Sequence, residues 1–127
     1  MSDLGHLLLI EDDESLASLL ATHLRARGYR VAVAPTAEHA QGLLATGDRP
    51  DLILLDINLP GETGWTVLRS EAYEVAGRPP VIVASAMAVN PARLREYGVA
   101  GYLPKPFAME TLRSTIERSL HPGMETA

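Results

Sequence analysis

Three short runs of the sequence are apolar at nearly every position, and they constrain the fold more than any other feature. They are HLLLI at residues 6–10, DLILLD at 51–56 and PVIVAS at 80–85. A strand with one face in water alternates apolar and polar residues, whereas a parallel strand that is covered on both faces is apolar throughout. The runs therefore predict a parallel sheet with helices on both sides.

The rest of the chain completes a repeating pattern of strand and helix. YRVAVA at residues 29–34 and AGYLP at 100–104 are two further predicted strands. The intervening segments show helical periodicity and helix-boundary residues such as an N-cap followed by proline. The predicted helices are a first one ending at Gly28, a second from Thr36 to about Gly47, a third from near Gly64, a short fourth from Asn90 to Gly98, and a last one over residues 109–120.

This pattern predicts an α/β fold of the doubly wound (βα)₅ type. It is a three-layer, flavodoxin-like sandwich with a parallel five-stranded sheet of order 2-1-3-4-5. The length of 127 residues and the hydrophobic content of 46% suit one compact domain.

Composition excludes several classes of function. With 11 Lys and Arg against 16 Asp and Glu, the net charge is −5, and no basic run is present, so direct nucleic acid binding is disfavoured. The absence of cysteine excludes disulfides and thiolate metal sites. No apolar stretch is long enough for a signal peptide or a membrane span, so we expect a cytoplasmic protein without membrane contact.

Acidic residues follow the first and third predicted strands. Glu11 and Asp12 come directly after the first, and Asp56 ends the third. In an open sheet of this order, ligands bind beyond the carboxyl ends of the strands where the order reverses, which is between these two. Like charges so close together favour a hard divalent cation, and Mg²⁺ prefers one or two carboxylates together with water and phosphate oxygens.

Neighbouring residues divide into those with a structural explanation and those that extend the site. Asp13 and Glu14 are explained by the start of a helix, where acids cap free amides. Ser85 ends the fourth strand and Lys105 follows the fifth, which adds a hydroxyl and an ammonium at the same edge. Each alone is an ordinary loop residue, but together they provide what a phosphoryl group on Asp56 requires.

Four motifs follow one another along the chain: LLLIEDDE, DLILLDINLPGETG, VIVASA and GYLPKPF. In their order and spacing, the sequence resembles the CheY-like receiver domain of two-component response regulators. The resemblance spans about residues 6–120. It implies a receiver domain over residues 1–121. Because the apolar stripe of the last helix ends before HPGMETA, we expect a flexible tail over 122–127.

The resemblance also implies a role for each residue of the site. Asp56 resembles the phosphoacceptor, Asp12 the direct ligand of Mg²⁺ or Mn²⁺, and Glu11 a ligand through water. Asn58 would offer the metal its backbone carbonyl, which leaves its side chain unconstrained.

Five further positions match the phosphate-binding and switching part of the family. Ser85 resembles the switch hydroxyl, and the small Ala86 lets its amide approach the phosphoryl group. Lys105 resembles the lysine that pairs with the phosphate, and Pro106 the cis-proline turn that directs it inward. Tyr102 resembles the aromatic residue that moves inward with the hydroxyl, although a half-buried strand tyrosine is an alternative explanation.

The implied function is a phosphorelay step. A sensor histidine kinase or a histidine phosphotransfer protein would donate the phosphoryl group, and the surface of the fourth helix, fifth strand and last helix would change. That surface is also compatible with a homodimer. The output partner is not encoded in any motif. The domain would be a phosphoacceptor that takes part in its own phosphotransfer and autodephosphorylation, and not an enzyme acting on other substrates.

Two alternatives and one departure qualify this interpretation. Haloacid-dehalogenase-type phosphatases carry a second Asp two residues after the nucleophile, where this chain has Asn58. A docking module that works without phosphorylation is the other alternative, although every residue needed for phosphorylation is present. Met87 stands where a polar residue is frequent in the family, and we expect it to slow hydrolysis of the acyl phosphate.

Overall fold

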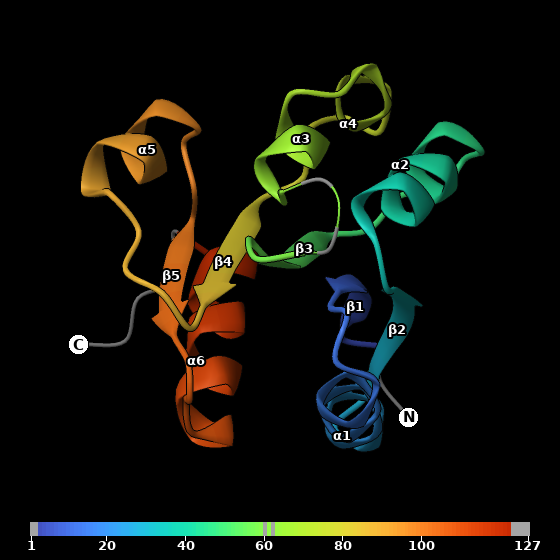
Figure 1. The fold of residues 1–127 in the computed structure, drawn as a ribbon. Helices are drawn as coiled ribbons and strands as arrows, with labels where there is room; N and C mark the ends of the chain where they lie inside the picture. The colour runs from blue at the N-terminus through green and yellow to red at the C-terminus, as the bar shows by residue number, and fades with distance from the viewer. Residues whose placement is uncertain (1–2, 60, 62, 123–127) are drawn as a thin grey trace.

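The computed structural model describes residues 3–59, 61 and 63–122. A central sheet lies between two layers of helices (Figure 1). The strands are β1 (Gly5–Ile10), β2 (Tyr29–Ala34), β3 (Leu52–Asp56), β4 (Val81–Ser85) and β5 (Gly101–Pro104). The helices are α1 (Glu14–Ala26), α2 (Ala37–Ala45), α3 (Trp65–Leu68), α4 (Glu71–Val75), α5 (Pro91–Glu96) and α6 (Met109–Leu120).

All neighbouring strands are parallel, and their order β2-β1-β3-β4-β5 confirms the predicted topology. The register places the carboxyl ends of the strands at one edge: Ile10 pairs with Leu55, and Asp56 pairs with Ala84. Residues that follow β1 and end β3 and β4 therefore meet, as the sequence predicted.

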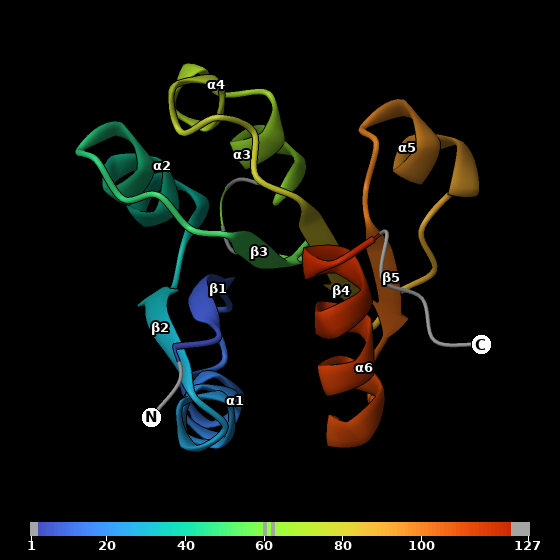
Figure 2. The same ribbon diagram turned by 180° about the vertical axis from the view of Figure 1, so that it is seen from behind.

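Each face of the sheet is covered by its own group of helices. The helices α1 and α6 lie on one face, and α2, α3, α4 and α5 lie on the other (Figure 1; Figure 2). Along β1, Leu7 and Leu9 belong to the apolar cluster beneath α1 and α6, while Leu8 and Ile10 belong to the opposite cluster. Both faces of the strand are buried, which explains why it is apolar at successive positions.

Most predicted helix boundaries are confirmed. Asp13 caps α1 by accepting a hydrogen bond from the Leu16 amide, and Thr36 caps α2 in the same way. Asn90 caps α5, whose first residue is Pro91, and this helix is short as predicted.

The prediction of one third helix was wrong, because the segment forms two short helices. Ser70 interrupts it with an extended backbone (φ −80°, ψ 152°). Its hydroxyl donates to the Val67 carbonyl and accepts from the Tyr73 amide, so the same side chain closes α3 and caps α4.

At the C-terminal end, α6 stops at Leu120. The predicted tail at residues 122–127 falls, apart from Pro122, outside the described residues and stays a prediction. None of the helices within residues 3–59, 61 and 63–122 is both long and apolar enough to cross a membrane.

Candidate functional site

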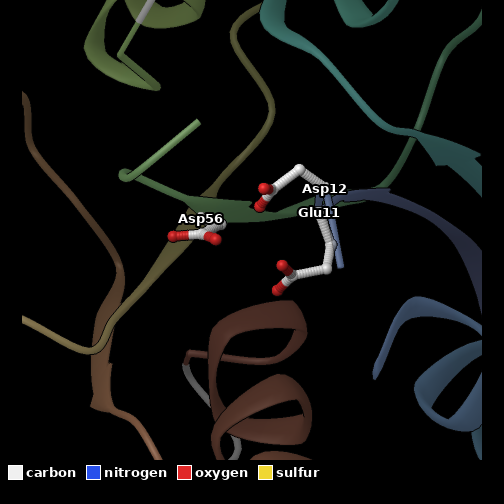
Figure 3. A group of neighbouring side chains, drawn as sticks. All are labelled: Glu11, Asp12 and Asp56. Carbon is white, nitrogen blue, oxygen red and sulfur yellow. The ribbon is translucent and has the colours of Figure 1, made fainter. Parts of the chain in front are cut away.

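Three carboxylates meet at the carboxyl edge of the sheet, and we call Glu11, Asp12 and Asp56 the acidic triad. One carboxylate oxygen of each lies within 4.8 Å of the others. Figure 3 shows the side chains of the two β1-end acids and of Asp56 gathered at this edge. Glu11 and Asp56 are only 3% and 5% exposed, whereas Asp12 is exposed to solvent. Two of the three carboxylates are thus buried and one is open to solvent.

The backbone around β1 explains why a charged residue is buried here. The Glu11 amide donates to the Ala34 carbonyl at 3.0 Å, which continues the β1–β2 pairing by one residue beyond the strand. Glu11 is therefore held in line with the sheet. Its side chain also accepts from the Asp13 amide at 3.2 Å.

Lys105 closes the acidic triad from the β5 side. Its Nζ donates to Glu11 Oε1 at 2.7 Å and to Asp56 Oδ2 at 3.2 Å, and its side chain is 16% exposed. Its amide donates to the Ser85 carbonyl at 2.8 Å, which fixes the start of the loop against β4. The peptide bond between Lys105 and Pro106 is cis.

The charges of this site are not balanced. Burial of the ammonium acts to lower the pKa of Lys105, but the hydrogen bond to Glu11 and the charges of Glu11 and Asp56 outweigh it and raise that pKa. Burial, helped by the charge of Asp56, raises the pKa of Glu11 against the opposing effect of Lys105. Three carboxylates and one ammonium leave a net charge of −2 when all are ionised.

The donor set fits a hard divalent cation. Two carboxylates are buried, a third is open to solvent, and no histidine or cysteine belongs to the group of potential ligands among the described residues. Oxygen donors that leave room for water are typical of Mg²⁺ and Mn²⁺ sites. A charge of +2 would match the charge that Lys105 leaves uncompensated.

Asn58 links Asp56 to the switch candidate Ser85. Its amide donates to Asp56 Oδ1 at 2.9 Å, and its side-chain Nδ2 donates to Ser85 Oγ at 2.9 Å. The expectation that the Asn58 side chain is unconstrained was wrong, because this side chain is held by its hydrogen bond to the Ser85 hydroxyl. Ser85 is 2% exposed and also bonds to the backbone of Met87.

The two remaining switch candidates lie next to this group. Ala86 directly follows Ser85 and is exposed. Tyr102 pairs with Val83 in the sheet, is half-buried and packs against the apolar cluster beneath α2 to α5. The structure thus brings the acidic triad together with Asn58, Ser85 and Lys105, and it places Tyr102 two pairing positions before the end of β4.

Two features near the site escaped sequence reasoning. Gly64 lies so close to Asp56 that a Cβ built on it would be 2.6 Å from the Asp56 carbonyl oxygen. Trp65 stacks on Tyr97 with ring centroids 4.8 Å apart, which joins α3 to the residue that caps the end of α5. Glycine in the GETG segment was a possible signal for the first contact, but nothing in the sequence pairs the two aromatic residues.

Comparison with known proteins agrees with this geometry. The family model of the response regulator receiver domain matches residues 7–117. The chain belongs to this family. It is a receiver domain of the kind found in two-component signalling, with the fold that the family shares.

Individual relatives give the same result. The chain is 43% identical over 109 residues to the transcriptional activator protein PfeR of Pseudomonas aeruginosa, covering 84% of this chain and 34% of that protein. It is 35% identical over 122 residues to the transcriptional regulatory protein CpxR of Escherichia coli, covering 91% and 51%. The chain therefore spans between a third and about half of the length of these relatives.

Superposition on a solved structure also supports the fold assignment. The non-phosphorylated receiver domain of HemR from Leptospira biflexa superimposes with a TM-score of 0.81 at 31% sequence identity. The match covers 96% of this chain and 98% of that domain. The likeness thus extends over the whole receiver fold.

Proposed function

We propose that Asp56 accepts a phosphoryl group from a histidine kinase or a histidine phosphotransfer protein. The observation that carries the proposal is the buried Asp56 carboxylate, 3.2 Å from Lys105 Nζ and adjoining two further acids. Positive charge is therefore available beside the nucleophile, and the exposed Asp12 borders it within the triad.

Mg²⁺, or Mn²⁺ in its place, is the cofactor that the acidic triad fits. Asp12, Asp56 and the backbone carbonyl of Asn58 would hold it directly, and Glu11 would do so through water. When bound, it supplies charge neutralisation for the incoming phosphoryl oxygens. Glu11 is already paired with Lys105, which is consistent with its indirect role.

The residues of this chain then perform a simple group transfer. An Asp56 carboxylate oxygen forms a bond to phosphorus while the bond from phosphorus to the donor's histidine nitrogen breaks, and the imidazole nitrogen leaves with the electron pair. Lys105 neutralises part of the charge on the transferred group, as a compact ammonium close to Asp56 is suited to do. The product is an acyl phosphate on Asp56. In autodephosphorylation, water takes up the phosphoryl group, so that inorganic phosphate leaves and the Asp56 carboxylate is restored.

The acyl phosphate changes the surface through Ser85. The hydroxyl turns toward a phosphoryl oxygen, the Ala86 amide approaches the same group, and Tyr102 follows inward. Shifting an equilibrium from 1:99 to 99:1 requires about 5.5 kcal/mol, and a few charge-assisted hydrogen bonds of about 1.5–3 kcal/mol each are sufficient. The surface of α5, β5 and α6 would carry the change to a partner or to a second copy of the chain.

The wider context of the domain is also part of the proposal. We assign residues 1–121 to the receiver domain, and its acidic charge indicates that this part does not bind nucleic acid itself. Because the relatives are transcriptional regulators of greater length, an output function outside this domain fits the comparison. A cytoplasmic location suits a partner kinase that donates phosphoryl groups inside the cell.

Intact mass spectrometry after incubation with acetyl phosphate and Mg²⁺ tests the proposal. The parent chain should gain one phosphoryl group, while Asp56→Asn and a chelator-treated sample should gain none, because the nucleophile or the charge-neutralising cation is missing. Folded parent protein without an adduct would contradict the proposal and favour a docking module that works without phosphorylation.

Replacing Met87 should shorten the lifetime of the acyl phosphate. The Met87 side chain is 67% exposed at the edge of the site, and only its backbone bonds to Ser85. In Met87→Glu, a carboxylate at this position accepts a hydrogen bond from the attacking water, so we expect hydrolysis to be severalfold faster. Decay of the phosphorylated protein after removal of acetyl phosphate measures this, with Met87→Gln as the uncharged comparison. Equal decay of parent and Met87→Glu would refute the explanation.

A further inference from the structure

Asn58 contacts both the nucleophile and the switch hydroxyl. It lies two residues after Asp56, and its backbone amide donates to Asp56 Oδ1 at 2.9 Å. Its side-chain amide reaches across to β4 and donates to Ser85 Oγ at 2.9 Å. The residue is itself exposed, so its side chain is not fixed by core packing, and this hydrogen bond determines where it points.

The hydroxyl of Ser85 has no free hydrogen-bonding capacity in this arrangement. A serine hydroxyl has one proton to donate and two lone pairs that accept. The proton is donated to the Met87 carbonyl at 2.9 Å, and the lone pairs accept from the Met87 amide at 3.1 Å and from Asn58 Nδ2. Ser85 is 2% exposed, so water does not compete with these partners.

We propose that the side chain of Asn58 is a positioning residue that holds Ser85 in the unphosphorylated arrangement. This inference rests on the proposed function, since it concerns the hydroxyl that a phosphoryl group on Asp56 would attract. To donate to a phosphoryl oxygen, Ser85 must withdraw its proton from the Met87 carbonyl and turn away from the Asn58 amide. The bond from Asn58 therefore opposes the switch, and it sets how far the equilibrium lies toward the unphosphorylated state.

Removal of this bond should make the switch easier to trigger. Asn58→Ala keeps the backbone amide that contacts Asp56 and the backbone carbonyl proposed for the metal, so only the side-chain bond is lost. The buried hydroxyl keeps both bonds to Met87, and the fold should be retained because position 58 is exposed. A neutral hydrogen bond contributes a factor of roughly 2 to 12 to an equilibrium constant, here the one between the unphosphorylated and the switched arrangement.

The test uses beryllium fluoride with Mg²⁺ as a probe that imitates the phosphoryl group. Its binding is followed by the amide NMR signals of Ser85 and Met87. In Asn58→Ala we expect half-saturation at a roughly 2- to 12-fold lower beryllium fluoride concentration. The free variant should also show these two signals displaced toward their bound positions. Thr63→Ala is the matched control, because this exposed side chain of the same loop forms no hydrogen bond within the described residues.

A second pair of variants separates the bond from Asn58 to Ser85 from other effects of Asn58. In a Ser85→Ala background there is no hydroxyl to hold, so Asn58→Ala should leave the half-saturating concentration unchanged. An equal effect in both backgrounds would overturn the proposal, since Asn58 would then act through the metal or Asp56. Unchanged binding in Asn58→Ala would overturn it as well. Failure of the folded parent to bind the probe at all would instead contradict the proposed function and remove this inference with it.

Discussion

Lys105→Ala is expected to slow phosphorylation by acetyl phosphate by about 10²-fold, the loss typical of removing one charge-stabilising group from a site of this kind. Lys105 Nζ lies 3.2 Å from Asp56 Oδ2 and 2.7 Å from Glu11 Oε1. Without the ammonium, one positive charge fewer offsets the repulsion between the negatively charged phosphoryl group and the acidic triad. Glu11 is also left buried without its partner. The initial rate of adduct formation at saturating Mg²⁺ measures the effect.

The control for Lys105 must remove a positive charge without touching the site. Arg49 is exposed between α2 and β3, at the opposite end of the strands from Asp56. Arg49→Ala therefore changes the net charge by the same amount, and we expect its rate to match that of the parent. A Lys105→Ala rate within about threefold of the parent, well below the loss expected for such a group, would show that the ammonium does not assist the transfer.

Gly64→Ala is expected to lower the free energy of unfolding by about 3 kcal/mol, at the upper end for an added methyl group in a tightly packed place. The backbone of Gly64 has ordinary helical angles (φ −61°, ψ −25°), so the conformation suits alanine. The obstacle is space: the new Cβ would lie 2.6 Å from the Asp56 carbonyl oxygen and 3.1 Å from the Ile57 Cα. Backbone atoms at the end of β3 cannot move aside without disturbing Asp56.

Gly42 provides the comparison within the same chain. It lies inside α2 and is exposed, and a Cβ there would meet nothing within 4 Å. Gly42→Ala should therefore stabilise the protein by about 0.5–1 kcal/mol, because alanine favours the helix. Chemical denaturation of both variants checks the pair. A Gly64→Ala protein as stable as the parent would show that the loop after β3 is free to relax.

The sequence predicted the parts of the fold that depend on local pattern. The runs that became β1, β3 and β4 are apolar on both faces, and the polar residue at each end identified the edge where they meet. That edge holds the acidic triad because parallel strands share one direction, which follows from topology alone. The caps at Asp13, Thr36 and Asn90 could be predicted because helix capping uses a few residue types at fixed positions.

Other features depend on contacts between distant parts of the chain. The break between α3 and α4 comes from a hydroxyl that serves two helices at once, which a helical pattern does not reveal. The bond from Asn58 to Ser85 joins residues 27 positions apart, and it forms only because β3 and β4 are neighbours. The stacking of Trp65 on Tyr97 likewise requires the helices to be placed first.

The central claim is that Asp56, and no other acid of the crowded edge, carries the phosphoryl group. Borohydride reduction of the phosphorylated chain tests it most directly, because hydride converts an aspartyl acyl phosphate to homoserine, which peptide mass mapping then locates. We expect homoserine at position 56 alone, and only in samples treated with acetyl phosphate and Mg²⁺. Reduction at Asp12 or Asp13, or at no aspartate in a chain that carries an adduct, would contradict the account.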